Sequence, residues 1–514
     1  MWDKKVFEKL NKVKSAAELG GGEKRIEKQH ASGKLTARER LEILFDKGTF
    51  TEVGALVESR IEEFGLKDKK VPGDGVVTGY GKINGKTVFA SSEDFTVIGG
   101  TLGEYHSFKI CRVMDMALEM GAPFVSINDS GGARIEEGIC SLDGYSGIFY
   151  RNTKMSGVVP QIAVILGPCA GGACYSPAIC DFIFMSEKTS RMFITGPQVV
   201  KAVTKEEVTA DDLGSAAVHS SVSGVNHFVY EDDEKCLLGV RELLSYLPQN
   251  NTEKAVTKSV IYSNTCDDLQ DIVPDNQRKP YDVKLLINKV VDDNSFFEIQ
   301  PKFAKNMVIG FSRINGETVG VVANQPSVLG GSIDCDSSDK AARFIRFCDC
   351  FNIPLLTFVD VTGFLPGKHQ EHAGIIRHGA KLLYAYSEAT VPKISVITRK
   401  AYGGAYIAMN SKNMGADAVF AWPIAQMAVM GAEGAVDIIF RRQIEAADDK
   451  NAQRNKLISE YEEKFMNPYI AAARGYVDEI IDPETTREKV ITAFQMLKTK
   501  KQEPLNKKHG NMPL

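Results

Sequence analysis

Two similar stretches, GYGKINGKTV at residues 79–88 and GFSRINGETV at residues 310–319, set the plan of this 514-residue chain. In each, an Asn-Gly pair separates two runs with β-branched residues, which is the pattern of a two-residue β-hairpin turn. The two stretches start 231 positions apart, at residues 79 and 310. We therefore expect the chain to contain two copies of one structural unit.

The match between the two halves continues well beyond the hairpins. Glycine pairs, a proline and an aspartate recur at the same spacing, and a Gly-Gly-Ala run recurs one residue later. The pairs are Gly99-Gly100 with Gly330-Gly331, Pro123 with Pro354, Asp129 with Asp360, and Gly171-Gly172-Ala173 with Gly403-Gly404-Ala405. A register that holds over some 90 residues indicates a duplication.

Strand and helix patterns alternate within each copy. Helical segments at 108–120 and 340–351 precede apolar strands at 123–128 and 354–360, which predicts an α/β class with mainly parallel pairing. A polar, broken stretch at 248–280 separates the copies. We predict domains at 1–255 and 256–514, a charged helical arm over residues 1 to about 45, and a helix-rich segment at 441–501.

Composition excludes several classes of function. The chain has 62 Lys+Arg against 66 Asp+Glu, a net charge of −4, and so no field that attracts a nucleic acid or an anionic membrane. The N-terminus is charged throughout, so we expect a cytoplasmic protein. Gly and Pro interrupt the most apolar region, 158–185, so no membrane span is predicted. The ten cysteines form no paired Cys-x-x-Cys pattern, so no metal site is predicted.

The strongest local motif is GPCAGGACYSP at residues 167–177, after the apolar strand 162–166 and before a helical segment. Small residues at such a turn let a substrate carbonyl approach the N–H groups of Gly171, Gly172 and Ala173, which would form an oxyanion hole. Close packing of strand and helix is the simpler explanation for one such motif. Gly403, Gly404 and Ala405 repeat it after the strand 393–398, which favours two matched holes.

Other candidate residues carry weaker signals. Glu136 and Glu137 could supply acid–base carboxylates, although solvated helix charge is the commoner role. His372 and His378 lie six residues apart and do not share a helix face as metal ligands at i, i+4 would. We expect these histidines to position loops.

Taken together, the motifs resemble those of the carboxyltransferase family of biotin-dependent acyl-CoA enzymes, in which each half is a crotonase-like domain. The resemblance runs nearly end to end and extends to propionyl-CoA carboxylase β subunits, methylmalonyl-CoA decarboxylase α subunits and the central transcarboxylase subunit. The motifs that carry it are residues 33–40, 129–138, 167–177, 192–197, 336–343, 363–367, 370–381, 399–406 and 507–511.

The resemblance implies that the first half binds an acyl-CoA, propionyl-CoA or methylmalonyl-CoA, and that the second half binds biotin. It places a further set of residues near the acyl-CoA, namely Gly131, Gly132, Ala133, Arg134, Tyr175 and Ile407. It places a second set on the biotin side, namely Phe364, Leu365, Pro366, Tyr402 and Tyr406. The chain departs from the family pattern at Ser215, Thr362, Lys368 and His369, so the biotin-side details are less firmly implied.

The sequence contains neither a Met-Lys-Met biotinylation site nor an ATP-binding loop. Biotin is therefore expected on a separate carrier protein, with a biotin carboxylase or membrane decarboxylase subunits as further partners. The resemblance also implies a homo-oligomer built from dimers, a hexamer. The direction of the reaction stays open, and two rival functions remain: a crotonase-type hydratase or isomerase using Glu136 or Glu137, and a non-catalytic scaffold of a decarboxylase complex.

Overall fold

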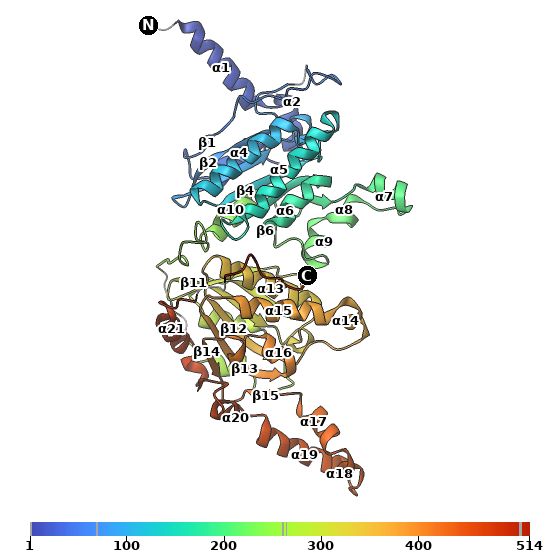
Figure 1. Cartoon of the computed structure of the whole chain (residues 1–514), viewed down its shortest axis with the longest axis vertical. Helices are drawn as coiled ribbons and strands as arrows, with labels where there is room; N and C mark the ends of the chain where they lie inside the picture. Colours follow the sequence, from blue (N-terminus) through green and yellow to red (C-terminus); the bar gives the residue numbers. More distant parts are fainter. Residues whose placement is uncertain (1–2, 68–69, 260–261, 264, 503–505) are drawn as a thin grey trace. The chain divides into compact units, whose positions relative to one another are not determined.

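The computed structural model describes residues 3–67, 70–259, 262–263, 265–502 and 506–514. The chain divides into two compact units, Met1–Glu253 and Lys254–Leu514, here called unit 1 and unit 2 (Figure 1). Residues 1–2 of the predicted arm lie outside the described residues. The rest of the arm forms the helices α1 (Lys4–Leu19), α2 (Glu23–Ala31) and α3 (Ala37–Leu44).

Unit 1 is built on a mixed eight-stranded sheet with the order β1-β2-β3-β4-β5-β6-β8, and β7 pairs with β5. β2 and β3 form the predicted antiparallel hairpin, and β3 to β6 run parallel. The strands are β1 (Thr51–Glu52), β2 (Val76–Ile83), β3 (Lys86–Glu93), β4 (Phe124–Ser130), β5 (Gln161–Ala170), β6 (Phe182–Ser186), β7 (Arg191–Phe193) and β8 (Phe228–Tyr230). The longer helices are α4 (Glu104–Met120), α5 (Ile139–Met155), α7 (Pro197–Thr204) and α10 (Asp233–Leu244).

Unit 2 repeats this arrangement with the order β16-β14-β13-β12-β11-β10-β9, and β15 pairs with β13. The strands are β9 (Phe297–Ile299), β10 (Met307–Ile314), β11 (Glu317–Asn324), β12 (Leu355–Val361), β13 (Lys393–Tyr402), β14 (Ala418–Ala421), β15 (Gln426–Ala428) and β16 (Glu479–Ile480). The longer helices are α12 (Val283–Val290), α13 (Cys335–Cys350), α15 (Ile375–Glu388), α17 (Ala432–Ile439), α19 (Lys450–Phe465) and α21 (Thr486–Leu497). The predicted α/β class is confirmed.

Corresponding residues of the two units have the same backbone conformation. Asn84 and Asn315 lie at φ 52° and 51°, each followed by a left-handed glycine, so both hairpins close as the sequence predicts. Lys109 on α4 and Lys340 on α13, again 231 positions apart (109 and 340), each bury an ammonium against backbone carbonyls. The duplication therefore extends to buried polar contacts.

Two strands are longer than their apolar runs suggest. The predicted strand 162–166 continues to Ala170, because Pro168, Cys169 and Ala170 pair with β7 beyond the end of β6. The predicted strand 393–398 continues in the same way to Tyr402, which pairs with β15. In each unit, a second short partner strand thus pairs with the end of the strand, and the glycine motif follows directly at the edge of the sheet.

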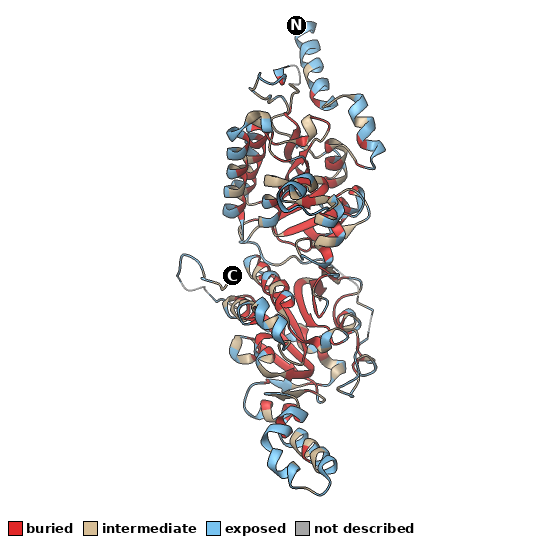
Figure 2. Cartoon of the chain, turned by 90° about the vertical axis from the view of Figure 1, so that its right-hand side faces the viewer, coloured by how far each residue is buried: buried red, intermediate tan, exposed pale blue. Residues whose placement is uncertain are grey.

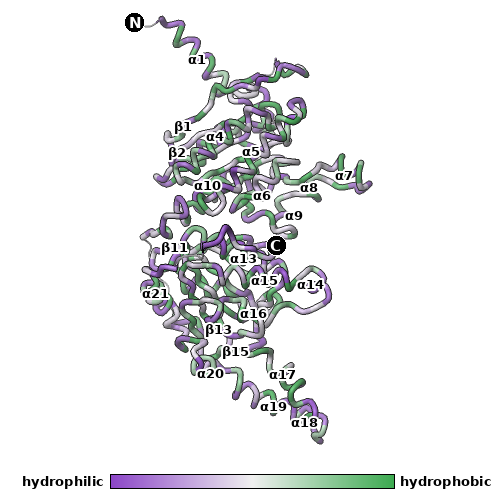
Figure 3. The backbone as a smooth tube through the Cα atoms, viewed as in Figure 1, coloured by the Kyte–Doolittle hydropathy of each residue, from purple (hydrophilic) through white to green (hydrophobic). Residues whose placement is uncertain are grey.

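Buried residues are concentrated in the two sheets and the inner faces of their helices (Figure 2). In the predicted helix-rich segment 441–501, α21 contributes Val490, Phe494 and Leu497 to the core of unit 2. Hydrophobic residues also occur on helices outside the cores, for example on α7 and α17 (Figure 3). No helix within the described ranges is long and apolar enough to cross a membrane.

Candidate functional site

The first glycine motif turns the chain sharply at the carboxyl end of β5. Gly171 has φ +64°, a left-handed conformation that favours glycine, and a short 3-10 helix, Gly171–Cys174, leads directly into α6 (Tyr175–Ile179). The first N–H groups of a helix have no acceptor inside it. Gly171, Gly172 and Ala173 are the first residues of this helical turn, so the turn itself offers no acceptor to their N–H groups.

Unit 2 has the same turn at the carboxyl end of β13. Gly403 has φ +60° and opens the helix α16 (Gly403–Ala408), which also contains Gly404 and Ala405. The surroundings of the second glycine differ between the units. A Cβ atom added at Gly172 would lie 2.9 Å from the ring of Tyr145, whereas one at Gly404 would lie 3.8 Å from the ring of Phe364. The unit 2 turn is the more open of the two.

A loop follows the neighbouring strand in each unit and runs beside the glycine turn. In unit 1, Leu102 N–H donates to Gly132 O at 2.9 Å, and Arg134 N–H donates to Leu102 O at 2.9 Å. A Cβ atom added at Gly132 would lie 2.9 Å from Ala170 O, so this glycine allows the loop to approach the end of β5. Gly131 and Ala133 belong to the same loop.

The matching loop of unit 2 is held by equivalent bonds. Ile333 N–H donates to Gly363 O at 3.0 Å, and Leu365 N–H donates to Ile333 O at 2.8 Å. Phe364 and Leu365 are half-buried here, and Pro366 is exposed. The predicted biotin-side residues of this loop therefore lie beside the glycine turn of their own unit.

Arg134 is placed differently from the other loop residues. Its side chain is fully buried, and its guanidinium donates to Asp74 Oδ1 at 2.8 Å, Glu137 Oε1 at 2.7 Å and Thr101 O at 3.0 Å. It therefore holds the loop in place and does not present its charge at the surface. Glu137 is engaged as well, because it also accepts from Glu104 N–H.

The remaining predicted residues line the two glycine turns. Tyr175, at the start of α6, is 48% exposed, and Ile407 on α16 is 45% exposed. Tyr402 and Tyr406 flank the unit 2 turn, and burial raises the pKa of both phenols. The Tyr402 hydroxyl donates to Gln426 on β15. The Ile407 side chain is accessible to solvent.

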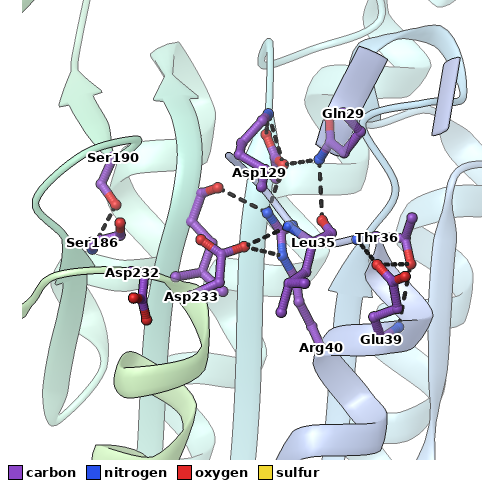
Figure 4. Close-up of polar contacts among 12 residues, drawn as sticks. Gln29, Leu35, Thr36, Glu39, Arg40, Asp129, Ser186, Ser190, Asp232 and Asp233 are labelled. Atoms are coloured by element: carbon purple, nitrogen blue, oxygen red, sulfur yellow. Dashed lines mark hydrogen bonds and ion pairs between the residues drawn. The ribbon is translucent and has the colours of Figure 1, made fainter. Parts of the chain in front are cut away.

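Sequence analysis missed the charged cluster that supports the first turn (Figure 4). Asp129, at the carboxyl end of β4, accepts from Gln29 at 2.9 Å, Lys34 at 2.9 Å and Arg40 at 3.0 Å, all from the arm. Arg40 also donates to Leu166 O on β5 at 2.9 Å. The arm thereby ties together the ends of the two strands that carry the loop and the glycine turn.

In unit 2, the matching carboxylate at the end of β12 is paired with a residue of the neighbouring strand instead of with the arm. Asp360 accepts from Arg399 Nε at 2.9 Å, and Arg399 lies on β13 itself. Burial raises the pKa of the Asp360 carboxyl. The sequence did show the repeated aspartates, Asp129 and Asp360, at the ends of matching strands. It did not show their partners, because the partners lie at unrelated positions in the two halves.

No group of three His, Cys, Asp or Glu residues that could hold an ion occurs in the described part of the chain.

Two α/β units of one plan, each with a glycine turn at the carboxyl end of a parallel strand, β5 or β13, have the architecture of tandem crotonase-like domains. The chain belongs to the carboxyl transferase domain family, which matches residues 28–512. It is therefore a carboxyltransferase.

Its relatives include three kinds of acyl-CoA enzyme subunit. It is 57% identical over 510 residues to a propionyl-CoA carboxylase carboxyltransferase subunit of Haloferax mediterranei, covering 99% of each chain. It is 56% identical over 518 residues to the methylmalonyl-CoA decarboxylase α subunit of Propionigenium modestum, again with 99% of each covered. A hexameric transcarboxylase 12S structure, solved with methylmalonyl-coenzyme A bound, superposes with a TM-score of 0.97 at 55% identity, covering 100% of this chain and 99% of that one.

Proposed function

We propose that this chain moves a carboxyl group between biotin on a separate carrier protein and a short acyl-CoA, propionyl-CoA or methylmalonyl-CoA. The observation that carries the proposal is the pair of matched glycine turns, at Gly171 in unit 1 and Gly403 in unit 2. One acyl transfer site would need one such turn. Two turns suit a reaction in which two different oxygen atoms gain negative charge.

Each turn stabilises one of these oxygens. In unit 1, the N–H groups of Gly171, Gly172 and Ala173 face the thioester oxygen of the acyl-CoA, which becomes negative when the α-proton is lost. In unit 2, the N–H groups of Gly403, Gly404 and Ala405 face the ureido oxygen of biotin. The open surroundings of Gly404 and the adjacent Phe364 ring fit the planar ureido ring of biotin. When bound, biotin supplies the carboxyl carrier and the base.

The assignment gives each unit one ligand. Domain 1–255 holds the acyl-CoA, with Tyr175 and the loop at Gly131 beside it. Domain 256–514 holds biotin, with Phe364, Leu365, Pro366, Tyr402 and Tyr406 around it. For Ile407, which belongs to the second domain, the proposed role is to sense acyl chain length. The engagement of Glu137 with Arg134 and Glu104 N–H makes a hydratase reaction through this carboxylate less suitable.

The active form is a homo-oligomer built from dimers, a hexamer, in the cytoplasm. The helix α7 after β7 exposes Val199 and Val203, at 50% and 75%, and α17 after β15 exposes Ile438 and Ile439, at 67% and 59%. Exposed apolar helix faces at matching places suit contacts with further copies of the chain. The other partners are the biotin carrier and either a biotin carboxylase or membrane decarboxylase subunits.

The test uses the purified chain with free biotin. Methylmalonyl-CoA should lose its carboxyl group in a biotin-dependent manner, measured as propionyl-CoA formed. Hydration of crotonyl-CoA without biotin would instead show a hydratase. No reaction with either substrate, in a folded oligomer, would leave the scaffold role and overturn the proposal.

A further inference from the structure

We propose that the buried side chains of Tyr145 and Glu93 position the first glycine turn and keep its inner side free of negative charge. This rests on the proposed function, in which the N–H groups of that turn hold a negatively charged oxygen. The two residues are 4% and 5% exposed, and neither lies in one of the sequence motifs named above. They are positioning residues, because they act through the turn and do not touch the substrate.

The ring of Tyr145, on α5, lies directly against Gly172. A Cβ atom added at Gly172 would be 2.9 Å from Cδ2 of this ring and 3.1 Å from Cε2. The ring also stacks on Phe149, one turn further along α5, with centroids 5.8 Å apart, and Phe149 meets Tyr175 at the start of α6 edge-on at 6.1 Å. The Tyr145 ring therefore limits how far Gly172 and its N–H group can move toward the core.

A small cavity joins Tyr145 and Glu93 to the turn. Both residues line it, and so does Ala173, the third residue of the turn. The cavity has a volume of about 20 Å³, room for about one water molecule, and the polar side chains of Ser126 and Asn128 also line it. A charge on the Glu93 carboxyl would therefore face the inner side of the turn across a very small space.

Glu93 has a neutral counterpart in unit 2. It lies at the end of β3, and the residue 231 positions later (93 and 324), at the end of β11, is Asn324. Glu93 Oε2 accepts from Asp129 N–H at 2.9 Å, and Asn324 Oδ1 accepts from Asp360 N–H at 3.3 Å. A protonated carboxyl group resembles an amide in having both an acceptor oxygen and a donor. The matching bonds thus suit a Glu93 that stays neutral.

The surroundings of Glu93 keep its carboxyl protonated at neutral pH. Burial raises its pKa to about 8, and the charge of Asp129 acts in the same direction. The hydrogen bond from Asp129 N–H and the positive charge of Arg40 in the arm act in the opposite direction, but burial outweighs them.

The other titratable groups around Glu93 carry no charge that would change this balance. On α4, His106 Nε2 lies 3.8 Å from Glu93 Oε1, but burial holds the pKa of this imidazole well below its usual value. Burial raises the pKa of the Tyr145 phenol on α5. A hydrogen bond with the Cys174 thiol, together with burial, raises the pKa of Cys169 on β5. All three side chains are therefore neutral.

Ionisation of Glu93 would oppose the chemistry of the turn. A carboxylate behind the turn would repel a negative oxygen held by its N–H groups, and charges interact strongly where little water screens them. The protonated form avoids this repulsion, whereas deprotonation above about pH 8 introduces it. The turn should therefore hold an anion less tightly at high pH.

The first test measures anion binding without catalysis. 2-Nitropropionyl-CoA has a nitro group in place of the carboxylate of methylmalonyl-CoA and readily loses its α-proton, so its thioester oxygen carries negative charge. Propionyl-CoA is the neutral reference. The preference of the wild-type oligomer for the anionic analogue, measured as a ratio of Kd values, should fall at least about threefold from about pH 7 to about pH 9. In Glu93→Gln the preference should not change with pH.

The control for this test is Glu58→Gln, at an exposed position, which should keep the wild-type pH dependence. A preference that falls equally in the wild type and in Glu93→Gln would overturn the role of Glu93. A wild type without any preference for the anion would overturn the whole inference.

The second test concerns the Tyr145 ring. Tyr145→Leu should lower the preference for the anionic analogue and the kcat with methylmalonyl-CoA at least about tenfold, with little change in KM, because the N–H donors lose their support. Tyr145→Phe keeps the ring and should stay close to the wild type, since the hydroxyl makes no hydrogen bond with the described residues. Tyr150→Leu, at a 62% exposed position on the same helix, is the control. An unchanged preference in folded Tyr145→Leu, or equal losses in Tyr145→Phe, would refute the packing role.

The binding ratios separate this inference from the proposed function, because they require no carboxyl transfer. The expected ratios in a wild type that moved no carboxyl group would support the role of Tyr145 and Glu93, and the proposed function alone would fail. An active wild type whose variants bind the analogue as it does would refute this inference alone.

Discussion

Arg40 Nη2 lies 3.0 Å from Asp129 Oδ2, and both side chains are fully buried. The same guanidinium donates through Nε to Asp233 Oδ2 at 2.9 Å, at the start of α10. A single arm residue thus connects the end of β4 with the start of a helix more than 100 positions further along the chain.

Replacing Arg40 with alanine should destabilise unit 1 strongly. Asp129 and Asp233 would both remain buried after losing their shared partner, and breaking such a pair costs about 3–5 kcal/mol. We expect a fall in Tm of roughly 10 °C for a unit of this size. The matched control is Arg441→Ala, whose exposed pair with Glu445 contributes about 0.5 kcal/mol. Similar Tm values for the two variants would contradict the role given to the buried cluster.

Valine at Gly172 or Gly404 should lower kcat about 100- to 1,000-fold, because a side chain obstructs the oxygen and shifts the N–H donors. Alanine substitutions at the same two positions should lower activity to different extents. At Gly172 its Cβ meets Tyr145 at 2.9 Å, while at Gly404 the neighbour is 3.8 Å away, so Gly172→Ala should be the more damaging. Steady-state rates and Tm of all four variants check this. Near wild-type rates in both folded valine variants would rule out the two-hole mechanism.

Ile407→Asp should change the preference among acetyl-CoA, propionyl-CoA and butyryl-CoA. The kcat/KM values of the wild type should differ only moderately among the three substrates, because one methylene group in an apolar pocket is worth only about 1–3 kcal/mol. A carboxylate at this half-exposed position disfavours the longer apolar chains. The kcat/KM ratios of the three substrates measure the effect, and identical ratios in both proteins would remove Ile407 from the acyl pocket.

Mixed oligomers can show whether chains share active sites. If the proposed function is right, the two glycine turns must come close together, and a twofold pair of chains could bring unit 1 of one chain to unit 2 of the other. A Gly172→Val chain refolded with a Gly404→Val chain should then regain activity, since one site keeps both turns intact. Each variant refolded alone is the control. Absence of activity in proven mixed oligomers would disprove shared sites.

Stability should fall with rising pH because of Glu93. Burial raises the pKa of its carboxyl to about 8 from the model-peptide value of 4.5, although its Oε2 accepts from Asp129 N–H. Between about pH 4.5 and 8 the folded chain therefore holds more protons at this residue than the unfolded chain, so the free energy of unfolding decreases as pH rises. Glu93→Gln, which stays neutral, should flatten the Tm profile over pH 5–8.5. Exposed Glu58→Gln should not, and a wild-type slope retained in Glu93→Gln would contradict this assignment.

The sequence by itself determined the features that depend on neighbouring residues. The Asn-Gly hairpins, the alternation of strand and helix, and the glycine turns at Gly171 and Gly403 were all predicted, because their backbone requirements are local. The duplication made these predictions stronger, since each motif occurs twice in register.

The tertiary structure alone decided the features that join distant segments. Arg25 meets Thr96 across 71 positions, Lys34 meets Asp129 across 95, and Arg40 meets Asp233 across 193. Arg134 showed no local sign that it would be buried between Asp74 and Glu137. Burial makes each of these charges depend on a specific partner, and only the packing of the arm on the ends of the strands determines which partner lies within reach.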